Sequence, residues 1–353
     1  MNSNRNGARR PSRSEQSVVS RHTTLRDNAR MLHQINRRLI ATVLAGFLSG
    51  VTVCDAWEHG PAPQQAPAPA PAERAPRNPL VQEAQEQADA GNHDGALALY
   101  GKVLASDPTL MDAHVGAGRA LDFLGKYGEA RRHYSQAVKL ARPETRAQAL
   151  SAMAVSHAFE SNATEAATFY QKAFDDRMAA GNPGSAAGLA NAIGRVYLES
   201  GDRENAEKWY RIGYETSKQI TGLSAEDRDL WLMRWHHAQG RIAARRGNIE
   251  EARRQAAALN EILAKGENED ERPQYQYLLG YIALDAGEYD RAIAELQKGN
   301  LTDSFVLGLI GRAYEKKGDA ENAKAYYAKV LASPSHSINT AFSRQWARNY
   351  LKQ

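Results

Sequence analysis

Adjacent histidines, His236 and His237, stand next to Trp231 and Trp235 and form the local cluster that most invites a metal site. Imidazole is a common protein ligand for zinc and related ions. Neighbouring side chains on a helix point about 100° apart, so these two rings cannot both face one ion. No His, Cys or acidic residue stands at the spacing that would complete a ligand set. We therefore expect a packed or solvent-facing pair and no metal.

Nucleophile and phosphate-binding patterns are also missing from the places where their chemistry needs them. Ser151 and Ser156 lie in helical sequence, without the strand-to-helix turn that exposes a catalytic serine. Glycine-rich matches fall at helix turns, so no phosphate loop is predicted. Acidic pairs such as Glu250 and Glu251 are typical of solvated helix surfaces. The sequence favours a non-enzymatic protein without cofactors; an enzyme with its site spread over distant segments is the alternative.

Cys54 is the only cysteine, which excludes an intramolecular disulfide and a cysteine-based zinc site. It follows a basic stretch with Arg37 and Arg38 and an uncharged apolar run over residues 39–53. This order over residues 31–56 is the layout of a secretory signal peptide or membrane anchor. The run is shorter than the roughly 20 residues of a spanning helix, although a tilted anchor would accommodate it.

The same segment resembles a bacterial lipoprotein signal, in which lipid is attached to the thiol of a cysteine that cleavage leaves at the N-terminus. The resemblance implies lipid attachment at Cys54. Val53 departs from the pattern, because a small residue normally precedes the cysteine. A plain signal peptide cut near Ala56, an uncleaved anchor, and twin-arginine export are the alternatives. Met31 is a second candidate start residue beside Met1.

Charge separates the N-terminal region from the rest of the chain. Residues 1–53 carry a net charge of +7, which leaves −3 for the remainder. A nucleic-acid binder concentrates Lys and Arg on its folded part, so nucleic acid is not a predicted partner. Residues 1–30 predict a disordered basic tail, and the Pro/Ala-rich residues 57–79 predict an extended linker.

A periodic pattern occupies residues 80–335. Pairs of a glycine and a polar residue recur, with Ser161 replacing glycine once, and an alanine stands five positions after the first member of each pair. The alanines are Ala96, Ala130, Ala166, Ala206, Ala252, Ala292 and Ala323. Good helix formers dominate the chain, and no segment shows the alternation of a half-exposed strand. An almost wholly helical protein is predicted.

This pattern resembles the tetratricopeptide repeat (TPR), a pair of antiparallel helices of about 34 residues. Small residues let the two helices approach closely at Gly118, Ala154, Gly194, Gly240, Gly280 and Gly311. Aromatic residues that would fill the space against the next repeat are Tyr100, Tyr134, Tyr170, Tyr210 and Tyr327. The resemblance implies an all-α TPR solenoid of about seven helix-turn-helix repeats over 80–335, with a capping helix over 336–353.

Longer spacings between repeats predict extended helices or loops around 176–186, 217–228 and 264–273. In the last helix, Phe342, Trp346 and Tyr350 recur at four-residue spacing and share one face. This face would hide the apolar surface that the final repeat leaves uncovered.

The resemblance also implies a binding surface, because the first helix of each TPR unit lines an inner groove. The groove-facing positions hold Arg119, Arg195, Arg241 and Arg312, with Gln85, Val155 and Tyr281 in the other repeats. Phe123, Tyr277 and Tyr281 are expected near the same wall. This stripe predicts a groove for an acidic, partly apolar segment of a partner protein. In the alternative, each arginine pairs with a nearby acid such as Asp122 or Glu315 and contributes little.

These features predict a non-enzymatic scaffold of the bacterial cell envelope, periplasm-facing and membrane-anchored, of the type that assembles pili, secretion machines or outer-membrane proteins. A chaperone-like or regulatory module that holds a secreted client or an envelope enzyme is the alternative. A soluble periplasmic or secreted protein is the alternative location. Other proteins or peptide segments are the expected partners, with no small-molecule substrate, and the membrane is reached through the N-terminal anchor or lipid.

Overall fold

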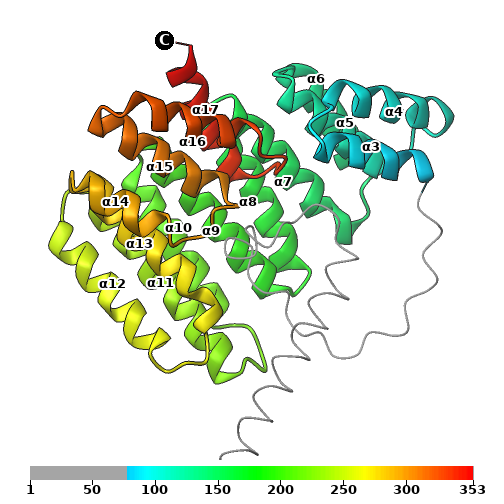
Figure 1. Cartoon of the computed structure of the whole chain (residues 1–353). Helices are drawn as coiled ribbons and strands as arrows, with labels where there is room; N and C mark the ends of the chain where they lie inside the picture. The colour runs from blue at the N-terminus through cyan, green and yellow to red at the C-terminus, as the bar shows by residue number, and fades with distance from the viewer. Residues whose placement is uncertain (1–77, 353) are drawn as a thin grey trace, which may run out of the picture. The chain divides into compact units, whose positions relative to one another are not determined.

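A computed structural model describes residues 78–352, which form fifteen α-helices and one short 3₁₀ helix, with no strand in this range (Figure 1). The helices are α3 (Pro79–Asp89), α4 (His93–Ser106), α5 (Met111–Phe123), α6 (Tyr127–Leu140), α7 (Pro143–Phe159), α8 (Ala163–Ala179), α9 (Pro183–Ser200), α10 (Arg203–Ser217), α11 (Ala225–Arg245), α12 (Ile249–Leu263), α13 (Arg272–Asp285), α14 (Tyr289–Leu296), α15 (Ser304–Lys317), α16 (Ala320–Leu331) and α17 (Ile338–Leu351). Seven consecutive pairs, from α3–α4 to α15–α16, pack as helical hairpins. The predicted all-α repeat solenoid is confirmed.

The residues of each turn explain where the first helix of a hairpin ends and the second begins. The turn residue takes a left-handed backbone, as at Gly201 (φ 94°) and Gly318 (φ 84°), and Ser161 does the same at φ 64°. Glycine adopts this conformation without steric cost. In five of the seven hairpins the polar residue that follows caps the second helix with its side chain, as Asp202 and Asp319 do by accepting a backbone N–H. Lys126 and Glu288 form no such bond.

The crossing between the two helices of each pair lies at the alanine predicted from the sequence. All seven of these alanines are completely buried. Most first helices carry a glycine at the closest approach. A Cβ atom on Gly118 would lie 2.6 Å from the ring of Tyr134, and one on Gly194 would lie 2.8 Å from Tyr210. These tyrosines pack on their own repeat and also contact the next one, as the sequence predicted. Tyr210 clusters with Ala238 and Ile242 of α11, and Tyr134 clusters with Ala149 and Met153 of α7.

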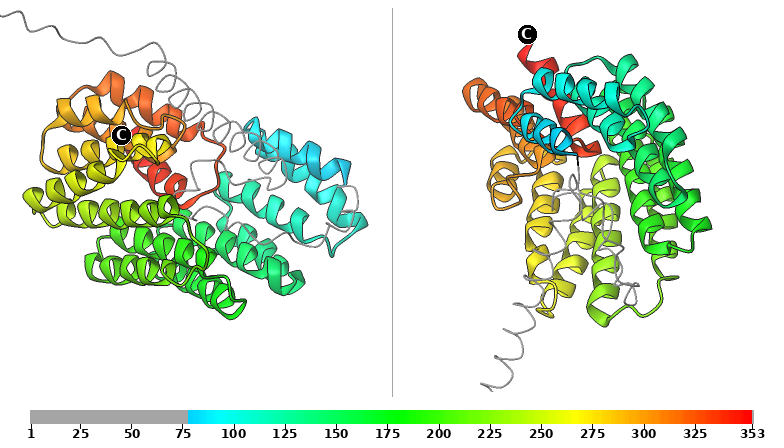
Figure 2. Two further views of the ribbon diagram at one scale, coloured as in Figure 1. Left: turned by 90° about the horizontal axis from the view of Figure 1, so that it is seen from below. Right: turned by 90° about the vertical axis from the view of Figure 1, so that its right-hand side faces the viewer.

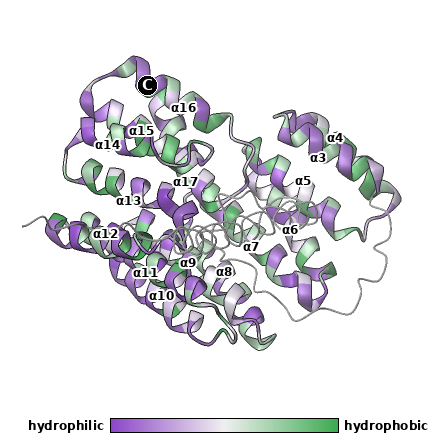
Figure 3. Ribbon diagram, turned by 60° about the horizontal axis from the view of Figure 1, so that its bottom comes forward, coloured by the Kyte–Doolittle hydropathy of each residue, from purple (hydrophilic) through white to green (hydrophobic). Residues whose placement is uncertain are grey.

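Tyr100 follows the same prediction, because its ring lies against Gly116 in the following repeat. The expected insertions are present as long helices and loops. Helices α8 and α9 have 17 and 18 residues, and loops that include the 3₁₀ helix Glu269–Glu271 flank α11 and α13. Polar and apolar residues lie on different sides of most helices (Figure 3).

Helix α17 packs against α15 and α16, as a cap on the last repeat should, and it also contacts α7 and α9 (Figure 2). Its buried face is wider than the predicted stripe. Asn339, Thr340 and Ser343 are buried, while Trp346 and Tyr350 are only partly covered. The extra contacts arise because α17 packs on two sides, against the last repeat and against helices much earlier in the chain.

Within residues 78–352, no helix combines the length and apolar character needed to cross a membrane. The predicted basic tail, the signal or anchor segment with Cys54, and all but the last two residues of the predicted linker lie outside the described residues.

Candidate functional site

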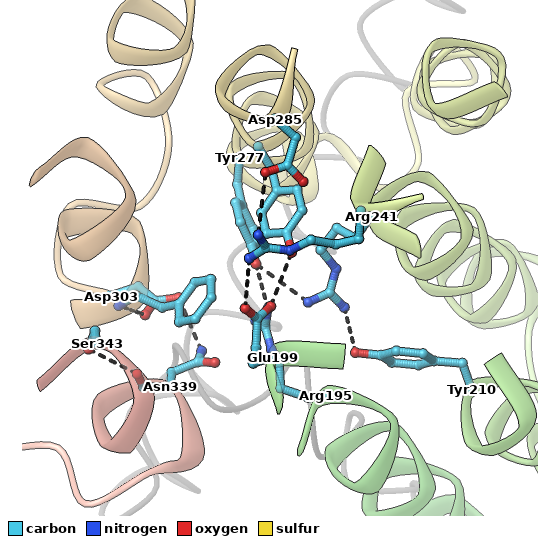
Figure 4. A network of polar contacts seen from close by, with 12 residues as sticks. Arg195, Glu199, Tyr210, Arg241, Tyr277, Asp285, Asp303, Asn339 and Ser343 are labelled. Atoms are coloured by element: carbon cyan, nitrogen blue, oxygen red, sulfur yellow. Dashed lines mark hydrogen bonds and ion pairs between the residues drawn. The ribbon is translucent and has the colours of Figure 1, made fainter. Parts of the chain in front are cut away.

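Polar side chains on α9, α10, α11 and α13 meet in one buried cluster, the arginine–tyrosine network (Figure 4). Its members are Arg195, Glu199, Tyr210, Arg241, Arg245, Tyr277, Tyr281 and Asp285. The members on α9, α11 and α13 are spaced four positions apart along each helix. Residues at this spacing lie on the same side of a helix, so each helix presents its members on one side. We call this side of α9, α11 and α13, together with the side of α15 that carries Arg312, the inner face.

Two arginines share one tyrosine hydroxyl at the centre of the network. Nη1 of Arg195 donates a hydrogen bond to Oη of Tyr277 at 2.6 Å, and Nη1 of Arg241 approaches the same oxygen at 3.5 Å. Nη2 of Arg241 donates to Oη of Tyr210 at 2.8 Å. Burial raises the pKa of Tyr277, so its hydroxyl stays protonated at neutral pH.

Glu199 supplies the negative charge that several other members of the network contact. Its side chain is only 1% exposed. It lies 3.7 Å from Arg195 and 3.0 Å from Nη2 of Arg245, and it accepts a hydrogen bond from Tyr281 at 3.2 Å. Arg245 also pairs with Asp285 at 3.4 Å. Buried ion pairs of this kind are strongly destabilised when one partner is lost.

An aromatic row connects the network to α17. The guanidinium of Arg195 lies 4.4 Å from the ring centre of Phe305, whose ring lies 4.8 Å from that of Trp346. On the other side, Arg312 stands 4.8 Å above Trp346. The rings of Phe305 and Trp346 therefore lie between two guanidinium groups, and cations are attracted to the faces of aromatic rings.

The structure brings four of the predicted groove residues together: Arg195, Arg241, Tyr277 and Tyr281 belong to the network, and each is less than 5% exposed. The other three predicted groove residues contact residues 336–352, which we call the C-terminal segment, or lie close to them. Arg312 is half-buried against Trp346, and Phe123 lies 4.9 Å from the guanidinium of Arg344. Arg119 is half-buried, and its Nε has no hydrogen-bond partner.

The acids that the alternative interpretation assigned to these arginines are used elsewhere. Asp122 accepts hydrogen bonds from Tyr134 and Ser156, and Glu315 accepts one from Tyr327 at 2.6 Å. Neither acid forms an ion pair with Arg119 or Arg312 in the described part of the chain.

The sequence analysis missed Glu199, Arg245 and Asp285, although a simple signal could have found them. Each stands four positions after a predicted groove residue and so lies on the same side of its helix one turn later. The two adjacent histidines point apart as predicted: His236 contacts Gln255 at 2.8 Å, while His237 is buried. Residues 78–352 contain no group of three or more His, Cys, Asp or Glu able to hold a metal ion.

Comparison with known proteins agrees with this architecture. Tetratricopeptide-repeat models match residues 87–154, 187–212, 237–300 and 306–334, which together make up more than half of the chain. The chain belongs to the tetratricopeptide-repeat family. Repeats of this family typically bind other proteins, so this TPR protein is a protein-interaction scaffold.

Individual relatives of this TPR protein resemble it in part. Cellulose synthase operon protein C of Escherichia coli K12 is 46% identical over 63 residues, which span 17% of this chain and 5% of that protein. Aspartyl phosphate phosphatase F of Bacillus subtilis is 13% identical, with 71% of this chain and 68% of that one covered at a TM-score of 0.51. A tetratricopeptide repeat protein of Parabacteroides merdae is 15% identical, with 77% and 98% covered at a TM-score of 0.46. The structural likeness concerns the fold alone.

Proposed function

We propose that this TPR protein is a non-enzymatic scaffold of the bacterial cell envelope, which binds an acidic, partly apolar segment of a partner along its inner face. The observation that carries the proposal is the accessible edge of the inner face, where the half-buried Arg312 stands 4.8 Å above the ring of the half-buried Trp346. These residue types dominate binding energy at protein interfaces. Stacked repeats offer an extended surface for such contacts.

Accessible residues at the edge of the network would make the first contact with a partner. Arg195 and Arg241 are buried, whereas Arg312 and Trp346 are half-buried and lie against each other. Arg312 has no carboxylate partner among residues 78–352. An acidic side chain of the partner would pair with Arg312 while a neighbouring apolar side chain covers Trp346.

The envelope location rests on the N-terminal sequence. A basic stretch, an apolar run and Cys54 stand in the order of an export signal, and the Pro/Ala-rich linker would hold the repeats away from a membrane. The relative named for a cellulose synthase operon supports only the repeats, because the match covers 5% of it.

Photocrosslinking in cells tests the binding face. A photoreactive residue in place of Arg312 should yield adducts with another protein. The same residue in place of Arg254, which is exposed on the second helix α12, should yield none. Arg312 is suited to this test because replacing the buried Arg195 or Arg241 would disturb folding. Equal adducts at both positions, or none at Arg312, would exclude the inner face as the binding site.

Fractionation and lipid labelling test the location. The repeats should be accessible to protease added outside the cytoplasmic membrane, and labelled fatty acid should enter the wild-type chain but not Cys54→Ser. Protection of the repeats inside the cytoplasm contradicts the envelope proposal. A wild-type chain without label contradicts lipid attachment alone.

A further inference from the structure

A small polar cavity lies between helices at one end of the arginine–tyrosine network. Its volume is about 20 Å³, room at its floor for about one water-sized group, such as a single oxygen of an ion whose other atoms face the opening. Its lining combines residues of α9, α10, α11, α13, the N-cap of α15 and α17: Asn191, Arg195, Tyr210, Arg234, His237, Arg241, Gln274, Tyr277, Asp303 and Asn339.

Positive charge dominates this lining. Arg195, Arg234 and Arg241 are 3%, 6% and 4% exposed, and Asp303 is the single carboxylate among the lining residues. The carboxylate of Asp303 accepts hydrogen bonds from the backbone of Phe305 and from Asn339. Glu199, the acid beside Arg195, is shared with Arg245 and Tyr281. The cavity is therefore a buried, net cationic space.

Among the arginines of the lining, Arg241 is the one whose positive charge is least compensated. No carboxylate lies within ion-pair distance of it among the residues that the structure describes. Its two hydrogen bonds go to the neutral hydroxyls of Tyr210 and Tyr277, and its buried Nε has no partner. Buried charges in proteins are normally paired, because an uncompensated one carries a large desolvation cost. An anion would supply the negative charge that Arg241 lacks.

Other lining groups supply the hydrogen-bond donors that an oxyanion needs. The hydroxyl of Tyr277 accepts from Arg195 and Arg241, so its own O–H is free to donate. Asn191 and Gln274 also line the cavity, and their side-chain amides carry N–H donors. Burial lowers the pKa of Arg234 to about 10, while Glu271 and Asp227 nearby act in the opposite direction.

We infer that the cavity is a binding site for one free, compact oxyanion of the phosphate or small-carboxylate class, which neutralises Arg241 and ties α9, α11 and α13 together. A free anion fits better than a partner's side chain, because every arginine of the lining is more than nine-tenths buried. This site is independent of partner binding at Arg312.

Thermal unfolding of the full-length protein tests the inference. Sodium phosphate, sodium acetate and sodium chloride are titrated at equal pH and ionic strength. Phosphate or acetate should raise the melting temperature saturably and above chloride. Phosphate also stabilises proteins generally by exclusion from their surfaces, so the decisive comparison is with variants.

Arg241→Gln should raise the half-saturating concentration of the effective anion at least about tenfold, because charge-assisted hydrogen bonds are lost. Arg211→Gln changes an exposed arginine paired with Glu207 and is the matched control, with no expected change. Tyr277→Phe, which removes one hydroxyl, serves if Arg241→Gln does not fold, and it should weaken binding as well. Wild-type protein that responds equally to all three salts overturns the site, as does an Arg241→Gln response identical to wild type.

Discussion

At the scale of single residues, Glu199 is the anchor of the buried charges on the inner face. Glu199→Gln preserves shape but leaves Arg195 and Arg245 without their shared carboxylate. Removing one partner of a buried pair costs about 3–5 kcal/mol, so urea unfolding should show a loss of this size. Glu207→Gln is the control. Glu207 pairs with Arg211 and Arg246 nearer the surface, and the expected loss is about 1 kcal/mol or less. Equal losses in the two variants would contradict the central role of Glu199.

Buried histidines make stability depend on pH. Burial together with Arg241 and Arg195 lowers the pKa of His237 well below its usual value, and burial lowers that of His336 despite its bond to Asp122. The unfolded chain therefore binds protons first as pH falls below about 6.5. Stability is complete above this pH and should fall by up to about 1.4 kcal/mol per pH unit for each histidine.

Urea unfolding at about pH 7.5 and about pH 5.5 measures this loss. His237→Gln removes the titrating group, so its stability should depend less on pH than that of the wild type. A wild-type protein of equal stability at both pH values would show that the buried histidines bind protons equally well when folded.

At the scale of helical elements, two glycines inside neighbouring α-helices should respond in opposite ways when a methyl group is added to each. Gly118→Ala places a Cβ atom 2.6 Å from the Tyr134 ring, which is overpacking that costs about 1–3 kcal/mol. Gly101→Ala, on the exposed side of α4, meets no atom within 4 Å and should stabilise by about 0.4–1 kcal/mol. Thermal unfolding checks both; a stabilised Gly118→Ala would mean that the helices do not approach at this position.

Local spacing explains how much of these elements the sequence predicted. The turn glycines, the crossing alanines and the seven hairpins each follow from residues within one repeat, so a periodic pattern suffices. The cavity could not be predicted in this way. Its lining needs Asn191 from α9, Asp303 before α15 and Asn339 from α17, and no local spacing connects them. Burial of Arg195 and Arg241 likewise depends on neighbouring repeats.

At the scale of the whole described chain, the C-terminal segment joins repeats that are far apart in sequence. Nε2 of His336 lies 2.8 Å from Oδ2 of Asp122, and both side chains are buried. Gln345 donates to the backbone carbonyl of Ala158 at 2.6 Å, and Arg348 to the hydroxyl of Tyr127 at 2.6 Å. In a simple solenoid each repeat contacts only its neighbours. Here the seventh repeat is linked through α17 to the second and third, as no periodic pattern could indicate.

This link should make distant repeats open together. His336→Ala removes the hydrogen bond to the buried carboxylate of Asp122, a loss of about 1.5–3 kcal/mol. Hydrogen exchange followed by mass spectrometry should then show faster exchange in α17 and also in α5, more than 200 positions away along the chain. Lys324→Ala, at an exposed position of α16, should leave both helices unchanged. If His336→Ala accelerates exchange in α17 alone, the C-terminal segment covers the second repeat without stabilising it, and the repeats open as independent neighbours.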